Sequence, residues 1–168
     1  EKITPVEGVE LNSVKNAVKY ADFSIGRFIE LAKAQEYYKD TIIVVISDHN
    51  TRVYGDDMIP IDMFHVPAII LGADVKPMTY DKLATQPDVL ATALDLIGLD
   101  LTYPIMGHSI FSDKKQNLAL MQFHTAYALR VDDKVAIIRP NKEALTFLYE
   151  DPESYLDKSK HLTPIEND

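Results

Sequence analysis

The sequence predicts an α/β fold, with a mostly parallel sheet flanked by helices and a small C-terminal antiparallel sheet. A helix pattern that begins near Ser13 leads into an apolar run in which five of the six residues at 42–47 are Ile or Val. Such a run, without polar alternation, is typical of a strand covered on both faces. A second helix pattern follows at 85–97, and from Leu118 four short strand-like pieces alternate with polar turns.

Length and composition narrow the possible classes of protein. The 168 residues fit a single domain, 1–168, which we divide into an α/β part (1–112), antiparallel hairpins (113–150) and a polar tail (151–168). We expect the tail to be a helical turn or disordered. With no cysteine there is no disulfide or thiolate site, and the net charge of −9 argues against nucleic acid as a general partner.

The N-terminal end of the sequence carries no targeting pattern. No run approaches the roughly 18 to 20 apolar residues of a membrane span, and the first ten residues lack the zones of a signal peptide. The first residue is Glu1 rather than Met. We therefore expect a piece of a longer protein.

The first helix is predicted by apolar residues that recur at steps of three and four from Val14 to Ala32. Either Ser13 or Asn12 is the expected N-cap, and the helix is expected to end near Glu36. The polar residues of this segment lie mostly on the other faces of the predicted helix. The apolar face of this helix is therefore predicted to be buried.

The middle of the chain contains a long loop, a second strand and a second helix. The loop at 50–64 exceeds the roughly 2 to 6 residues usual in α/β units, and long loops of this kind usually carry function. The strand is predicted at 68–71, and the helix from a Thr85 cap with Pro87 in its first turn to Gly98. Its predicted buried stripe consists of Val89, Leu90, Ala93, Leu94, Leu96 and Ile97.

The C-terminal strands are predicted at 118–124, 125–131, 134–139 and 144–150, with a hairpin turn at Asp132 and Asp133. Short connections favour antiparallel pairing, because parallel strands need a long crossover.

Asp48 and His49 follow the first strand directly and are the candidate metal ligands. In open α/β sheets, ligands bind at the carboxyl ends of the strands. A carboxylate beside an imidazole suits Zn or Mn better than an all-oxygen Ca or Mg site. The alternative is that Asp48 is an ordinary turn or cap residue, and two ligands alone do not complete a site.

Arg52 and His65 are the candidate substrate-binding residues. Arg52 lies four residues after Asp48 and has a guanidinium suited to bidentate contacts with a phosphate or glycerophosphate group. The alternative role of Arg52 is structural, as a loop residue that forms an ion pair with Asp56 or Asp57. His65 precedes the second strand and is a candidate donor to a substrate oxygen or a metal-site carboxylate, with a structural capping role as the alternative.

Three other histidines are interpreted as structural. We assign His108 to the surface or to packing, His124 to cross-strand packing and His161 to the tail.

The order of the motifs resembles a known family. YADFSIGRFIE, DTIIVVISDHN, HVPAIIL, QPDVLATALDLIG and GHSIF follow one another between about Asn16 and Phe111. This order resembles the C-terminal part of the sulfatase-like membrane phosphoglycerol transferases, the lipoteichoic acid synthase type within the alkaline phosphatase superfamily. The later hairpins agree with the small C-terminal sheet of that family.

The resemblance implies that the chain is the C-terminal portion of a metal-dependent catalytic domain that acts on phosphate or sulfate esters, lipid or glycan linked. Asp48 and His49 match the family's metal pair, with Mn the first expectation and Zn or Mg as alternatives. Sulfatases proper usually carry Asp-Asn there, so His49 favours the phosphoryl-transfer branch. Asn50 stands where the superfamily often has Gly.

The resemblance also implies that the nucleophilic threonine lies upstream. No catalytic residue is therefore expected in this chain, and the isolated chain is expected to be inactive. The expected partners are the missing N-terminal part of the same protein and a phosphate- or sulfate-ester substrate, such as a lipid headgroup. The expected location is extracytoplasmic, with a membrane-anchored parent. The alternatives are a non-catalytic binding or sensing module that retains the fold, or a stable domain without activity.

Overall fold

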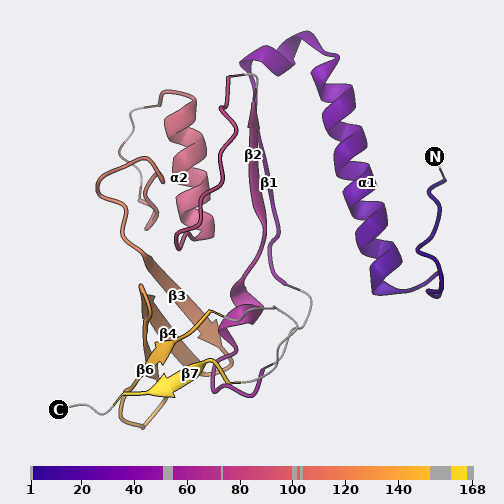
Figure 1. Ribbon diagram of the computed structural model, residues 1–168. Coiled ribbons are helices and arrows are strands. Elements are labelled where there is room, and N and C mark those ends of the chain that lie inside the picture. Colours follow the sequence, from indigo (N-terminus) through magenta and orange to yellow (C-terminus); the bar gives the residue numbers. More distant parts are fainter. Residues whose placement is uncertain are drawn as a thin grey trace. The chain divides into compact units, whose positions relative to one another are not determined.

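The computed structural model describes residues 2–50, 55–72, 74–99, 102, 104–151 and 160–165 (Figure 1). The chain forms two compact units. The first consists of Glu1–Ile42 with Gly72–Asp74, and the second consists of Ile43–Leu71 with Val75–Asp168. Helices and two sheets occur together, so the predicted α/β class is confirmed, as is the small antiparallel sheet near the C-terminal end.

Helix α1, Val14–Lys33, begins at Ser13, one of the two predicted N-caps. The Ser13 hydroxyl accepts the Asn16 N–H at 3.3 Å, which satisfies one of the free donors of the first turn. The Asn16 side chain also bonds the lead-in segment, because it accepts the Val6 N–H at 2.7 Å and donates to the Glu10 carbonyl at 2.8 Å. The Ser13 cap and the hydrogen bonds of Asn16 to the preceding segment together determine where the helix starts.

The predicted burial of the apolar face of α1 is not what the structure shows. Ala32 is the buried residue of this helix, whereas Val14 is 65% exposed and Phe28 is 54% exposed. The amphipathic pattern is present, but most of its large apolar side chains are more than one third exposed. A 3-10 helix, η1 (Glu36–Asp40), follows α1. No helix in the described residues is both long and apolar enough to cross a membrane.

The first sheet pairs β1, Ile42–Ile46, with β2, Ala68–Gly72 (Figure 1). Ser47, just after β1, donates its N–H to the carbonyl of Pro67, just before β2, at 3.3 Å. The two strands therefore run in opposite directions, so this pair does not show the predicted parallel order. In the described part of their connection, the helical element is the single turn η2, Ile61–Phe64, which is too short for a crossover helix.

The predicted coverage of β1 on both faces is also not met. Val44 and Ile46 are each more than one third exposed, and Ile69 of β2 is 53% exposed. The uninterrupted apolar run correctly predicted a strand, because β-branched residues favour that backbone. The described residues cover its side chains only in part.

Helix α2, Gln86–Leu96, has the predicted limits. Thr85 is its N-cap, and Gly98 follows its end with a positive φ of 74°. The predicted buried stripe is partly wrong, because Leu90 and Ile97 are each about half exposed. The buried residues of the helix are instead Asp88, Ala91, Thr92 and Ala93.

The second sheet is antiparallel throughout, in the order β3-β4-β5-β6-β7. The strands are β3 (Leu118–Phe123), β4 (Ala126–Val131), β5 (Lys134–Ile138), β6 (Leu145–Tyr149) and β7 (Leu162–Pro164). The first four match the predicted strands. The fifth corrects the prediction that the tail is a helical turn or disordered, because its described end pairs with β6. Three residues are too few to show a periodic pattern.

The hydrophobic core of the second unit lies between this sheet and the segment that follows β1. Ile59 and Ile61 come from that segment and are almost fully buried. The sheet contributes Met121, Ala128, Val135, Ile137, Phe147, Tyr149 and Leu162. Burial of these side chains therefore holds the loop after Asp48 and His49 against the C-terminal sheet.

Candidate metal site at the end of β1

Asp48 and His49 lie in a tight turn directly after β1. The Asp48 carboxylate accepts the His49 N–H at 2.9 Å, and the Ser47 hydroxyl donates to the His49 carbonyl at 2.8 Å. These short-range bonds satisfy the backbone where the strand pairing stops. They leave both functional side chains pointing to solvent, with exposed fractions of 88% for Asp48 and 81% for His49.

The imidazole of His49 is oriented by the backbone. Its Nδ1 lies 2.9 Å from the Asn50 carbonyl, which is a contact for a protonated Nδ1 because a carbonyl only accepts. Nε2 then carries the lone pair and lies 3.7 Å from Oδ2 of Asp48. An orienting bond from the second ring nitrogen to a carbonyl is usual for histidines that bind metals.

Gln86 anchors this turn from the start of α2. Its side-chain amide donates to the carbonyls of Ser47 at 2.8 Å and Asp48 at 3.1 Å. The sequence analysis did not identify this role of Gln86. No sequence signal was available, because the partners are 38 and 39 residues away.

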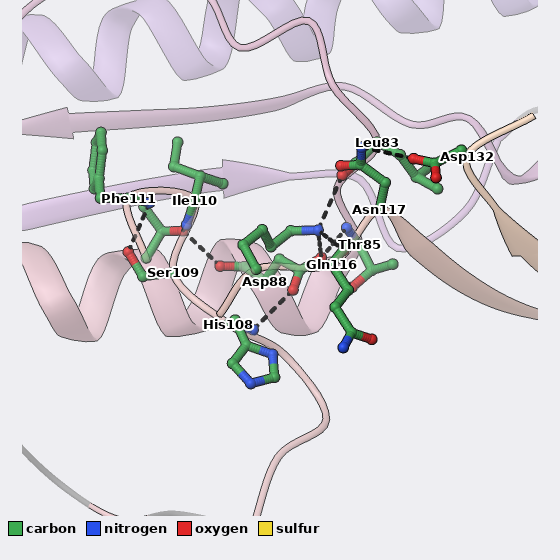
Figure 2. Close-up of polar contacts among 12 residues, drawn as sticks. Leu83, Thr85, Asp88, His108, Ser109, Ile110, Phe111, Gln116, Asn117 and Asp132 are labelled. Atoms are coloured by element: carbon green, nitrogen blue, oxygen red, sulfur yellow. Dashed lines mark hydrogen bonds and ion pairs between the residues drawn. The ribbon is translucent and has the colours of Figure 1, made fainter. Parts of the chain in front are cut away.

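The N-terminal turn of α2 is held by the buried carboxylate of Asp88, which Figure 2 shows at the centre of its contacts. Asp88 accepts the Thr85 N–H at 2.8 Å and the His108 N–H at 2.9 Å. The ammonium group of Lys115 lies 3.4 Å away and is itself almost fully buried. Burial by itself raises the pKa of Asp88, but the hydrogen bonds from His108 and Thr85, together with the Lys115 charge, outweigh it and hold the pKa below the ordinary 3.8.

The segment 107–111 packs closely on this helix end. A Cβ on Gly107 would lie 2.2 Å from the carbonyl carbon of Pro87, so only glycine permits the approach. The Thr92 hydroxyl donates to the Asp88 carbonyl at 2.7 Å and accepts the Ile110 N–H at 3.0 Å (Figure 2). The GHSIF motif thus supports the helix that holds the Asp48–His49 turn.

Asn50 connects the turn to η2. Its side-chain amide donates to the carbonyls of Asp62 at 3.3 Å and His65 at 3.0 Å. His65 is exposed and is the C-cap of η2, with its N–H bonded to the Asp62 carbonyl at 3.2 Å. The structure therefore brings the His65 backbone to the candidate site. Its proposed role in substrate binding stays a prediction.

The C-terminal sheet clamps η2 through buried polar groups. The Tyr149 hydroxyl donates to Oδ1 of Asp62 at 2.6 Å, and Nε2 of His161 lies 3.9 Å from Oδ2. Burial, the hydrogen bond to Asp62 and the nearby carboxylates raise the pKa of Tyr149 well above 10, against the opposing charge of Arg130. Tyr149 therefore remains a neutral donor.

A second contact between the C-terminal sheet and this loop is made by Asp57, which precedes η2. The Asp57 carboxylate accepts the His161 N–H at 2.7 Å and the Leu162 N–H at 3.3 Å. The start of β7 is thus bound to the loop after β1, which places His161 in a structural contact that its position in the tail did not indicate.

The described residues contain no group of three or more His, Asp or Glu side chains arranged to hold a metal ion. Asp48 and His49 lie close together without a third described ligand, and their role as metal ligands stays a prediction. Arg52, the other candidate substrate residue, lies outside the described residues.

Comparison with known proteins identifies the family. The family model for sulfatases matches residues 6–99, more than half of the chain. The chain belongs to the sulfatase family. Its structure is also similar to that of a protein in the alkaline phosphatase superfamily from Vibrio parahaemolyticus, with a TM-score of 0.85 and 31% sequence identity. That match covers 100% of this chain and 40% of the other, so the chain spans about two fifths of the related protein's length.

The superfamily expected from the motif order is therefore confirmed. A sulfatase-family domain indicates an enzyme superfamily with hydrolase-like function, whose members generally use divalent metal ions. The matched residues of this sulfatase chain include the Asp48–His49 turn and all of α2.

Proposed function

We propose that this sulfatase-family chain is the C-terminal portion of a metal-dependent enzyme that hydrolyses or transfers phosphate or sulfate esters. Within that class we favour phosphoglycerol transfer or hydrolysis of a lipid- or glycan-linked headgroup, because His49 stands where sulfatases proper usually have Asn. The observation that carries the proposal is the orientation of His49, whose Nδ1 bonds the Asn50 carbonyl while Nε2 lies 3.7 Å from Asp48 Oδ2.

The donors fit a divalent metal ion. Nε2 of His49 and Oδ2 of Asp48 lie 3.7 Å apart on exposed side chains, so together they would offer one nitrogen and one oxygen donor to such an ion. The family resemblance makes Mn the favoured ion, with Zn or Mg as alternatives. When bound, such an ion lowers the pKa of a nucleophile and offsets charge on the ester oxygens.

The remaining residues of the site orient these ligands and the substrate. Gln86 and Asn50 fix the backbone on either side of the metal pair, so that the ligands need little reorganisation. For Arg52 we propose a bidentate contact with the ester's anionic oxygens, which rests on the sequence. For His65 we propose hydrogen-bond donation to a substrate oxygen.

The active centre needs residues that this chain does not supply. We propose that the nucleophile and the other metal ligands belong to the N-terminal part of the same protein, outside the cytoplasm and anchored to a membrane. The isolated chain is then inactive. The second candidate is a non-catalytic binding or sensing module, which is favoured by the lack of a three-ligand group in the described residues.

Calorimetric titration of the chain with MnCl₂ and ZnCl₂ tests the metal pair. Two protein ligands should give one weak site, with a Kd above about 1 μM. The Asp48→Ala/His49→Ala variant should lose this signal. The variant Asp22→Ala/His108→Ala removes the same chemical groups from exposed positions elsewhere and should keep it. Equal binding by all three proteins contradicts the proposed ligands.

Activity must be tested in the longer protein. Addition of Mn should produce hydrolysis of bis(p-nitrophenyl) phosphate, and Asp48→Ala should abolish it. A parent protein that binds Mn but turns over neither phosphate nor sulfate esters supports the binding module instead.

A further inference from the structure

An open hollow lies at the end of the C-terminal sheet where β3 turns into β4 and where β5 ends. Its volume is about 500 Å³. The lining includes the basic side chains His124, Arg139 and Lys142, and the apolar side chains Met58, Phe123 and Pro140. None of these residues belongs to the Asp48–His49 turn, so the hollow is independent of the proposed metal site.

Two tight turns shape the hollow. Phe123 pairs with Ala126, which leaves a two-residue turn in which His124 adopts a positive φ of 52°. The His124 ring meets the Phe123 ring edge-on, with centroids 4.4 Å apart. On the other side, the Lys142 N–H bonds the Arg139 carbonyl at 3.3 Å. The basic residues are therefore held on short connections between paired strands.

Arg139 is the unusual member of the lining. Its Nε atom is buried without a hydrogen-bond partner among the described residues. Arg130, on the neighbouring strand β4, differs from Arg139 because its Nε has an acceptor. That Nε donates to the Asp132 carbonyl at 2.8 Å, and its Nη1 lies 3.6 Å from Asp151. A buried guanidinium donor without an acceptor is costly, because it has lost its water.

The charge of the hollow is opposite to that of the chain. The whole sequence carries a net charge of −9, yet the hollow is lined by basic residues and no acidic one. Arginine binds tetrahedral oxyanions through a planar pair of N–H donors, and lysine adds a compact positive charge. An oxyanion in the hollow would bring a negative charge next to the Arg139 guanidinium.

We propose that this hollow binds a phosphate or sulfate group, with the Arg139 guanidinium as its main ligand. Lys142 and His124 add donors at the rim. The apolar wall of Phe123 and Pro140 suits the organic part of an ester, so both a free oxyanion and an ester are candidate sources of the group.

Nuclear magnetic resonance titration of the ¹⁵N-labelled chain tests this proposal with three probes: inorganic phosphate, inorganic sulfate and glycerol 3-phosphate. We expect saturable shifts confined to the turns around His124 and Arg139. Tighter binding of glycerol 3-phosphate identifies an ester site, and equal binding of the three identifies a site for the oxyanion alone. Absence of saturation at millimolar concentrations, or shifts spread along the surface, would overturn the proposal.

Matched variants locate the ligand. Arg139→Gln should weaken binding at least tenfold, whereas Lys134→Gln, which removes the same charge from an exposed position at the start of β5, should leave it unchanged. Equal weakening by both variants means general charge attraction and rejects the site. If Arg139→Gln does not fold by circular dichroism, Arg139→Lys and Lys142→Gln replace it, and each should still bind more weakly than Lys134→Gln.

Discussion

Asp88 is ionised in a place where burial opposes the charge. Its carboxylate is only 6% exposed, and it is kept charged by the Thr85 and His108 N–H groups and by Lys115. Because its pKa in the folded chain lies below its unfolded value, this group stabilises the fold above about pH 4. That stabilisation is lost as the pH falls through the lowered pKa.

Asp88→Asn should therefore lower stability at pH 7 by about 2 to 4 kcal/mol, since Lys115 is left buried without its counter-ion. Thermal melts between pH 7 and pH 3 measure the effect. The melting temperature of the wild type should fall more steeply below pH 4 than that of the variant. Parallel curves would show that Asp88 is not responsible. Asp22→Asn, at an exposed position of α1, should match the wild type.

Gln86→Ala should loosen the Asp48–His49 turn without unfolding the chain. Two side-chain hydrogen bonds are lost, each contributing on the order of 1 kcal/mol. Hydrogen exchange of the Ser47 and His49 amides should become about fivefold to tenfold faster, and Mn affinity should fall. Gln35→Ala is the control, because Gln35 makes no side-chain cap bond to η1. Unchanged exchange at both amides would exclude the anchoring role.

Single residues were predictable where the cause is local. Ser13 was identified as a cap from its immediate neighbours, and the strand that precedes Asp48 and His49 was identified from its apolar run, whereas the role of these two residues as metal ligands stays a prediction. The role of Gln86 was not predictable, because its partners are 38 and 39 residues away. For Asp88, its spacing from Thr85 signals a local capping box, but its contact with His108, 20 residues away, has no local signal. The unpartnered donor of Arg139 has no sequence pattern at all.

At the scale of elements, the contact between α2 and the segment 107–111 depends on one missing side chain. A Cβ at Gly107 would lie 2.2 Å from the carbonyl carbon and oxygen of Pro87. Because these are backbone atoms, neither can rotate away. The segment must move, and the His108 and Ile110 hydrogen bonds move with it.

Gly107→Ala should consequently destabilise the chain by about 2 kcal/mol or more, in the range of other overpacked sites. Gly26→Ala is the matched control. It lies inside α1 with nothing near the added methyl group, and should stabilise the chain by roughly 0.5 to 1 kcal/mol. Urea denaturation measures the free energy of unfolding of both variants, which should fall for Gly107→Ala and rise for Gly26→Ala. Equal effects would indicate that the close approach is relaxed in solution.

Helix and strand limits were predictable because caps and periodicity are local. The direction of β2 relative to β1 was not, since an uninterrupted apolar run suits either direction. The strand β7 was missed because Leu162 is its only buried residue. Burial was overestimated in α1 and β1, because periodicity shows which face is apolar and does not show what covers it.

At the scale of the whole molecule, apolar side chains are exposed on several elements, among them Val14, Phe28, Val44, Ile69 and Leu90. A related structure of which this chain covers 40% has further chain in which such faces can be covered. Large exposed apolar surface leads to association.

The 168-residue chain should therefore bind the dye ANS strongly and self-associate at micromolar concentration, as measured by light scattering. Phe28→Lys, on α1, should reduce both effects, and Lys19→Arg, on the same helix, should change neither. A monomer that does not bind the dye would show that these faces are not free in solution.

The clamp on the loop after β1 also sets an order of events during synthesis. Asp57 is bound by the His161 N–H and Asp62 by the Tyr149 hydroxyl, 104 and 87 residues further along the chain. At ordinary translation rates, the ribosome needs roughly 5 to 20 seconds to make a stretch of that length. Asp48 and His49 are therefore synthesised before the residues that hold the loop after them. A chain that stops before β7 keeps the Asp48–His49 turn but lacks the hydrogen bonds from His161 and Leu162 to Asp57, so the loop after the turn gains all of its contacts only in a polypeptide translated past Leu162.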